Sequence, residues 1–179
     1  MRKAVLIFGS ILVFLFSCKK NNIENKKNNV KIKSDSKDVL SCQIAMIQNK
    51  KIKLLKTVLG DSLKTTNHVV FLYNGFDCGT CIDIGYEMTK KMDSISKAQL
   101  VYVVSTSANI GRDQLKNDYQ KYVYNDEKDL IRKDLKYIYT PVFLLLDSKN
   151  KICKVFYPNY NRDRKKENLF IKECQGNFK

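Results

Sequence analysis

The chain has few of the residues that build metal sites and disulfide-rich scaffolds. Its 179 residues include one histidine, no tryptophan, two prolines and seven glycines. A single histidine argues against His-rich metal sites and Ser-His-Asp hydrolysis. Six cysteines are too few for a small disulfide scaffold, in which cysteine exceeds about 8–10% of residues. The cysteines therefore call for a chemical explanation rather than a structural one.

What the chain does have is enough apolar material for one folded domain. Hydrophobic residues make up 44% and aromatic residues 11%, which excludes global disorder. The net charge of +15 would suit nucleic acid or an anionic surface. However, Arg2 and Lys3 carry two of these charges, and residues 19–38 hold seven Lys against three acids, which leaves +9 on residues 39–179. No basic stripe is visible there, so we expect no nucleic-acid partner.

The first seventeen residues have the pattern of an export signal. Met1-Arg2-Lys3 is positively charged, and residues 4–16 are nearly all apolar but too short to span a bilayer. Leu15-Phe16-Ser17-Cys18 resembles the bacterial lipobox, which implies a lipoprotein signal peptide over residues 1–17 and lipidation of Cys18. We therefore predict a bacterial cell-envelope protein anchored to a membrane through the lipid on Cys18. The alternative is an ordinary secretory signal with an incidental cysteine.

A tether is predicted to follow, over residues 18–38. Residues 19–38 are rich in Lys and Asn and poor in large apolar side chains. Such a segment cannot bury enough surface to offset its chain entropy, so we expect it to be disordered and extended. We interpret it as a spacer rather than a patch that binds anionic lipid. The folded domain is then predicted to occupy residues 39–179.

Strand and helix patterns alternate along residues 39–179. Short apolar, β-branched runs predict buried strands, and apolar residues at helical spacing predict helices. Alternation of this kind is typical of an α/β domain with a mixed, mostly parallel sheet flanked by helices. Helices are expected at residues 39–59 (ending at Gly60), 81–97, 111–120, 126–136 and 163–174, and strands at 68–73, 99–104, 121–124, 142–146 and 151–156.

The chemistry is concentrated in Cys78-Gly79-Thr80-Cys81. This C-x-x-C follows a buried strand and opens a helix, where unpaired N–H groups stabilise a thiolate. Cys78 is therefore the natural nucleophile. Cys81, one turn later, is placed to act as the resolving thiol that breaks a mixed disulfide.

Three other interpretations of the C-x-x-C were weighed. A zinc site would need further ligands, but there is no second C-x-x-C, and His68 lies at the other end of the strand, so we predict no metal. Haem attachment requires C-x-x-C-H, and Ile82 stands in place of that histidine. A purely structural disulfide is the remaining alternative.

A second motif lies some sixty residues downstream. Tyr139-Thr140-Pro141-Val142 places a proline immediately before a buried strand, at the strand's start, where the missing N–H is tolerated. Together, VVFLYNGFDCGTC, the helix after it and IYTPVFLLLDSKNKI resemble the thioredoxin-fold thiol-disulfide oxidoreductases, and most of all the tethered TlpA/ResA-like branch. The resemblance implies a thioredoxin-like fold, Cys78 as nucleophile, Cys81 as resolving thiol, and Thr140 with Pro141 as the substrate-side loop.

The sequence also departs from that family. Many members have Trp before the first cysteine and Pro between the two, where this chain has Asp77 and Gly79-Thr80. Asp77 has two readings: it caps the helix, or its charge opposes the thiolate of Cys78 and so tunes that thiol's pKa. Peroxiredoxin-type peroxidase chemistry is disfavoured, because Gly75 stands where that family has its catalytic threonine.

Three cysteines remain without an assigned role: Cys42, Cys153 and Cys174. Because their number is odd, at least one should be free or paired with another molecule. A disulfide from Cys42 to Cys153 or to Cys174 is possible, and Cys153 is expected to be a small core residue in its strand.

The sequence therefore predicts a thiol-disulfide oxidoreductase, acting as a disulfide reductase or isomerase. It needs no bound cofactor, but it needs protein thiols or disulfides as substrates and a redox partner that resets Cys78 and Cys81. The alternative is a non-catalytic thioredoxin-fold lipoprotein with a structural disulfide, serving as a protein-binding module.

Overall fold

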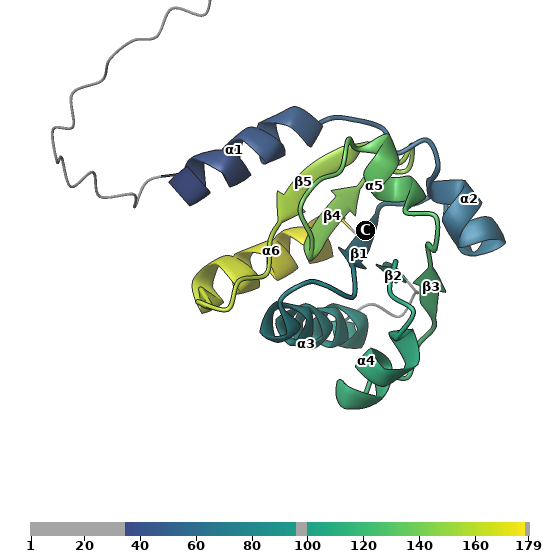
Figure 1. Ribbon diagram of the computed structural model, residues 1–179. Helices are drawn as coiled ribbons and strands as arrows, with labels where there is room; N and C mark the ends of the chain where they lie inside the picture. The colour runs from purple at the N-terminus through teal and green to yellow at the C-terminus, as the bar shows by residue number, and fades with distance from the viewer. Residues whose placement is uncertain (1–34, 96–99, 178–179) are drawn as a thin grey trace, which may run out of the picture. The chain divides into compact units, whose positions relative to one another are not determined.

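The computed structural model describes residues 35–95 and 100–177. The predicted signal peptide, Cys18 and residues 19–34 lie outside the described residues. Within these ranges, no helix combines the length and apolar character needed to cross a membrane. The elements, labelled in Figure 1, are α1 (Asp35–Ile47), α2 (Leu55–Leu59), η1 (Gly60–Ser62), β1 (His68–Tyr73), α3 (Gly79–Ile95), β2 (Val101–Ser105), α4 (Ile110–Lys116), β3 (Val123–Asn125), α5 (Leu130–Asp134), β4 (Val142–Leu146), β5 (Ile152–Phe156) and α6 (Arg164–Asn177).

The strands form one five-stranded mixed sheet in the order β3-β2-β1-β4-β5. β1 runs parallel to β2, and β2 parallel to β3, whereas β4 is antiparallel to both β1 and β5. The β4–β5 hairpin has the predicted turn, in which the Asp147 carboxylate accepts the backbone N–H groups of Lys149 and Lys151, each at 2.8 Å. The predicted fold class, an α/β sheet flanked by helices, is confirmed.

Successive side chains of each strand enter opposite cores. In β1, Val70 and Leu72 face a core covered by α1, α2 and α5, whereas Val69, Phe71 and Tyr73 face a core covered by α3 and α6. Because both faces are covered, β1 is apolar or aromatic at every position after His68, and this run made its limits predictable.

The helix predicted over residues 39–59 is two helices. α1 begins at Asp35, so residues 35–38, predicted to belong to the tether, lie in it. After α1 the chain runs along the edge of β5, where the N–H groups of Asn49 and Ile52 donate to Ile152 and Asn150 at 2.9 Å each. Ile52 is fully buried there, and this extended segment interrupts the helical periodicity.

On the other face, α3 and α6 lie side by side (Figure 1). Gly85 of α3 lets the helix pass close to the sheet: a Cβ there would lie 2.0 Å from the Phe71 ring. Arg162 joins the two helices by donating to Glu87 of α3 at 2.5 Å and to Glu167 of α6 at 2.6 and 3.0 Å. Glu167 is buried, so its charge is paired where water cannot solvate it.

Candidate redox site

The C-x-x-C stands at the junction of β1 and α3. Cys78 is the residue before the helix and is exposed, whereas Cys81 lies in its first turn and is buried. The Cys81 backbone N–H points at the Cys78 sulfur, 3.4 Å away. Both cysteines are thiols in this structure. A donor aimed at the exposed sulfur stabilises negative charge there, as expected at a helix N-terminus.

Cys81 differs from Cys78 in its surroundings. Burial raises the pKa of the Cys81 thiol to about 11, and the nearby Cys78 and the Asp77 carboxylate add to that rise. A backbone hydrogen bond from Tyr160, in the β5–α6 loop, acts in the opposite direction. At neutral pH Cys81 therefore carries its proton, and Cys78 is the sulfur that solvent and a partner can reach.

Asp77 connects two loops instead of capping α3. Its carboxylate accepts the backbone and side-chain N–H groups of Asn74, both at 2.8 Å. It also accepts the hydroxyl of Thr140 at 2.9 Å. Burial raises the pKa of Asp77, and these donors partly offset the rise. Of the two readings of Asp77, these contacts do not support the helix cap.

The loop of Thr140 and Pro141, predicted to be on the substrate side, lies against this carboxylate. The Thr140–Pro141 peptide bond is cis. The register pairs Leu72 with Val142, so Pro141 stands beside the end of β1, just before the C-x-x-C loop. The Asn74 amide also donates to the Thr140 hydroxyl at 2.7 Å. The structure thus brings together the segments that carry Cys78, Cys81, Asp77, Thr140 and Pro141.

Three residues of this region were missed from the sequence. Asn74 follows a strand and precedes Gly75, a turn signal that could have indicated it. Gln43 and Tyr160 carry no local signal, because they contact the site only through the fold. Gln43, in α1, accepts the backbone N–H of Tyr139 at 3.0 Å across 96 positions of the chain.

The three remaining cysteines are free thiols that differ in their exposure to solvent. Cys42 and Cys153 are exposed thiols, so the prediction that Cys153 is a core residue is wrong: on β5 its side chain points away from the core. Cys174 is fully buried in the core beneath α3 and α6, and burial raises its pKa to about 12.

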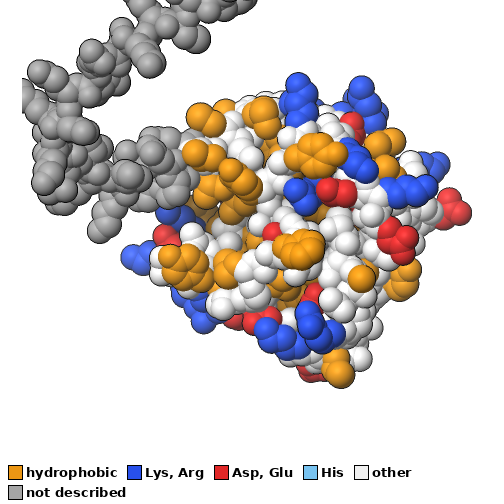
Figure 2. Space-filling view, viewed as in Figure 1, with side chains coloured by type: hydrophobic (Ala, Val, Ile, Leu, Met, Phe, Trp, Pro, Cys, Tyr) orange, Lys and Arg blue, Asp and Glu red, His pale blue; other side chains and the backbone are white. Residues whose placement is uncertain are grey.

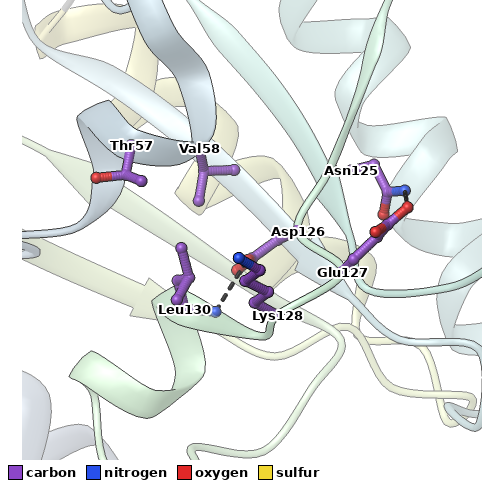
Figure 3. Close-up of a pocket in the computed structure, with 7 residues that line it drawn as sticks. All are labelled: Thr57, Val58, Asn125, Asp126, Glu127, Lys128 and Leu130. Carbon is purple, nitrogen blue, oxygen red and sulfur yellow. Dashed lines mark hydrogen bonds between the residues drawn. The ribbon is translucent and has the colours of Figure 1, made fainter.

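A cavity of about 360 Å³ lies elsewhere, between α2, the end of β3 and α5 (Figure 3). The buried Asp126 carboxylate at its wall is engaged by the N–H groups of Leu130 and Ile131 at 2.9 and 3.0 Å. None of its lining residues belongs to the loops around the C-x-x-C. Over residues 35–95 and 100–177, no group of three His, Cys, Asp or Glu could hold a metal ion.

The fold was compared with known proteins. A secreted Mycobacterium tuberculosis disulfide oxidoreductase, described as homologous to E. coli DsbE, matches with a TM-score of 0.50 and 11% identity, over 65% of this chain and 86% of that one. This chain has a thioredoxin-like fold. No family model and no curated protein matches the sequence.

Other solved structures similar to this thioredoxin-like chain have diverse activities. A thiol-disulfide isomerase from Corynebacterium glutamicum matches with a TM-score of 0.47 and 18% identity, over 64% of this chain and 83% of that one. A peroxiredoxin Q mutant from Xanthomonas campestris matches with a TM-score of 0.46 and 11% identity, over 64% and 82%. The comparison with the Mycobacterium tuberculosis oxidoreductase, at 11% identity, establishes the fold alone, so the activity must be argued from the candidate site itself.

Proposed function

We propose that this chain is a bacterial cell-envelope lipoprotein of the TlpA/ResA-like branch that carries out thiol-disulfide exchange, as a reductase or isomerase. The observation that carries the proposal is the pairing of an exposed Cys78 with a buried Cys81 in the first turn of a helix, beside the Thr140–Pro141 loop. One sulfur is open to a partner, and the other is reserved for the second step.

The reaction in the reducing direction is balanced by these two sulfurs. The Cys78 thiolate attacks a substrate disulfide, forms a mixed disulfide and releases one substrate sulfur, which takes up a proton. Cys81 then gives up its proton and attacks the Cys78 sulfur, releasing the second substrate thiol. The substrate gains two electrons and the chain ends with a Cys78–Cys81 disulfide. A dithiol redox partner must reduce that disulfide before another turnover.

The high pKa of Cys81 determines the order of the two attacks. Because the pKa is about 11, Cys81 is almost entirely a thiol at neutral pH, and it does not compete with Cys78 for the first attack. Burial is the main cause, so Cys81 becomes reactive only within the mixed disulfide, where it stands next to the Cys78 sulfur.

The surroundings of Cys78 favour a polypeptide as the substrate. Phe76 is fully exposed, and Tyr139 and Tyr160 are more than half exposed, so each of the three loops at the site presents an aromatic side chain. On the face shown in Figure 2, apolar, basic and acidic side chains are interspersed. The basic side chains do not form a single stripe there. Exposed aromatics beside a reactive sulfur suit contact with a protein chain.

The experiment that tests the activity is insulin reduction by the wild type and Cys78→Ser, with dithiothreitol as the electron source. We expect a lag-free reduction by the wild type and only the background rate with Cys78→Ser, because the nucleophile is lost. Equal rates, together with a Cys78–Cys81 disulfide that resists dithiothreitol, would instead favour the non-catalytic protein-binding module.

The anchor is tested separately, because Cys18 lies outside the described residues. We expect labelled palmitate to be incorporated into the wild type and not into Cys18→Ser in bacterial cells. Equal labelling of both would exclude the lipid anchor and leave the redox proposal untouched.

A further inference from the structure

Gln43 is a side chain of α1 that reaches the loops of the redox site. Its Oε1 accepts the backbone N–H of Tyr139 at 3.0 Å and the hydroxyl of Tyr157 at 3.2 Å. Since a backbone N–H can only donate, the atom facing it must be the amide oxygen. One acceptor thus bridges two loops that are distant in the sequence.

Both of these loops touch the C-x-x-C on their other side. Tyr139 directly precedes Thr140, whose hydroxyl donates to Asp77 at 2.9 Å. Tyr157 begins the segment that carries Tyr160, whose backbone bonds to Cys81. Gln43 therefore contacts, on their far side, two loops that also contact the segment of the C-x-x-C.

The other described side chains of α1 bury little surface against the domain. Of its side chains from Val39 onward, only Ile47 is fully buried, and Val39, Cys42 and Met46 are exposed. Next to α1, the Gln48 amide donates to the Cys153 carbonyl on β5, on the side away from these loops. The double contact of Gln43 is thus a polar link between α1 and the site.

We propose that Gln43 is a positioning residue, whose amide oxygen fixes the Tyr139–Pro141 loop relative to the Tyr157–Tyr160 loop so that a bound polypeptide presents its sulfur to Cys78. This inference rests on the proposed thiol-disulfide exchange. A small disulfide needs no such support, because it does not lie on the loops. Loss of the oxygen should therefore impair polypeptide substrates and spare small ones.

The test uses the full chain and two disulfides: insulin, and hydroxyethyl disulfide as the small one. For Gln43→Ala we expect the KM for insulin to rise about fivefold or more, the equivalent of one lost neutral hydrogen bond. The kcat, the rate with hydroxyethyl disulfide and the reduction potential of the Cys78–Cys81 pair should stay at the wild-type values. Gln43→Glu keeps an acceptor oxygen and should restore the low KM.

The matched control is Gln48→Ala, which removes a similar amide and its cross-chain bond but should leave the KM for insulin unchanged. An unchanged KM in Gln43→Ala would overturn the inference, and so would equal losses with both disulfides, which would indicate a generally loosened fold. If the wild type reduces insulin no faster than Cys78→Ser, the proposed function fails first and the inference falls with it.

Discussion

The two faces of the sheet are built differently, although helices cover both. On one face, α3 and α6 have 17 and 14 residues, pack against each other and are joined by Arg162. On the other face, α2 and α5 have only five residues each, and α1 is held through few side chains. Cys81 belongs to the first face, and the Tyr139–Pro141 loop follows α5 on the second.

In the proposed reaction, this difference would separate the reacting sulfurs from the loops that contact the substrate. Groups carried by a long, well-packed helix are held more accurately than groups on loops. The sulfurs thus keep a constant geometry. The loops on the other side depend on a few polar side chains, such as Gln43, Asp77 and Asp126, each of which accepts two or three hydrogen bonds and can be replaced on its own.

The largest effect should come from crowding the tight face. A methyl group at Gly85 would overlap the Phe71 ring, which cannot move aside because it stacks on Phe143 at 4.6 Å between centroids. We expect Gly85→Ala to lower the free energy of unfolding by about 2–3 kcal/mol in chemical denaturation.

Gly111→Ala is the control for that prediction. Gly111 is also helical, but a Cβ there meets nothing within 4 Å. Alanine should therefore be neutral or raise the stability by about 0.5–1 kcal/mol, since it restricts the unfolded chain. If Gly85→Ala were as harmless as Gly111→Ala, the tight packing of this face would be refuted.

A somewhat smaller effect is expected on the other face. The buried Asp126 carboxylate accepts the first two N–H groups of α5, and Asp126→Ala would leave both without that acceptor. We expect a loss of about 2 kcal/mol, typical of hydrogen bonds to a charged group. Amide exchange should speed up in α5 well before β1. Asp126→Asn keeps one acceptor oxygen and should lose less, and uniform exchange across both faces would contradict the prediction.

The smallest expected effect is a loss of stability at acid pH, through the protonation of Glu87. Hydrogen bonds from Arg162 and then Lys91 lower the pKa of Glu87 to about 2 from an ordinary value of 4.5. Because the folded pKa is lower, the stabilisation is present above pH 4.5 and is lost as the pH falls from there toward 2. The side chain is 37% exposed, so solvent screens the effect.

The measurement is the free energy of unfolding of wild type and Glu87→Gln as a function of pH. Their difference should be steady at neutral pH and shrink below about 4.5, the ordinary pKa of the group. A difference that stays constant down to pH 2 would show that the pairing with Arg162 does not contribute.

The elements that were predicted accurately from the sequence are those that are most buried. β1 and β4 have the predicted limits, because strands buried on both faces are continuous apolar runs, interrupted here only by His68 at the first position of β1. The helix predicted over residues 126–136 is only Leu130–Asp134, because the chain turns at Asp129, with a φ of 53°, and Asp126 caps the helix from outside it. Apolar spacing does not reveal either feature.

Much the same holds for the candidate site. The segments of Cys78, Cys81, Thr140 and Pro141 could be identified because each belongs to a short local motif. The structure places those segments together. The orientation of Asp77 toward Asn74 and Thr140 was not predictable, because Thr140 is 63 positions away. The contact of Gln43 with this region could not be predicted either, because its partner Tyr139 is 96 positions away.

The segment that interrupts the helices after α1 also has a consequence for self-association. β5 is an edge of the sheet, and an open edge invites a strand from another molecule. Here Asn49 and Ile52 donate to Asn150 and Ile152, and the Lys50 carbonyl accepts from Ile152, so the outer side of β5 is already occupied at its start. A second copy of the chain therefore could not add a strand along the start of β5.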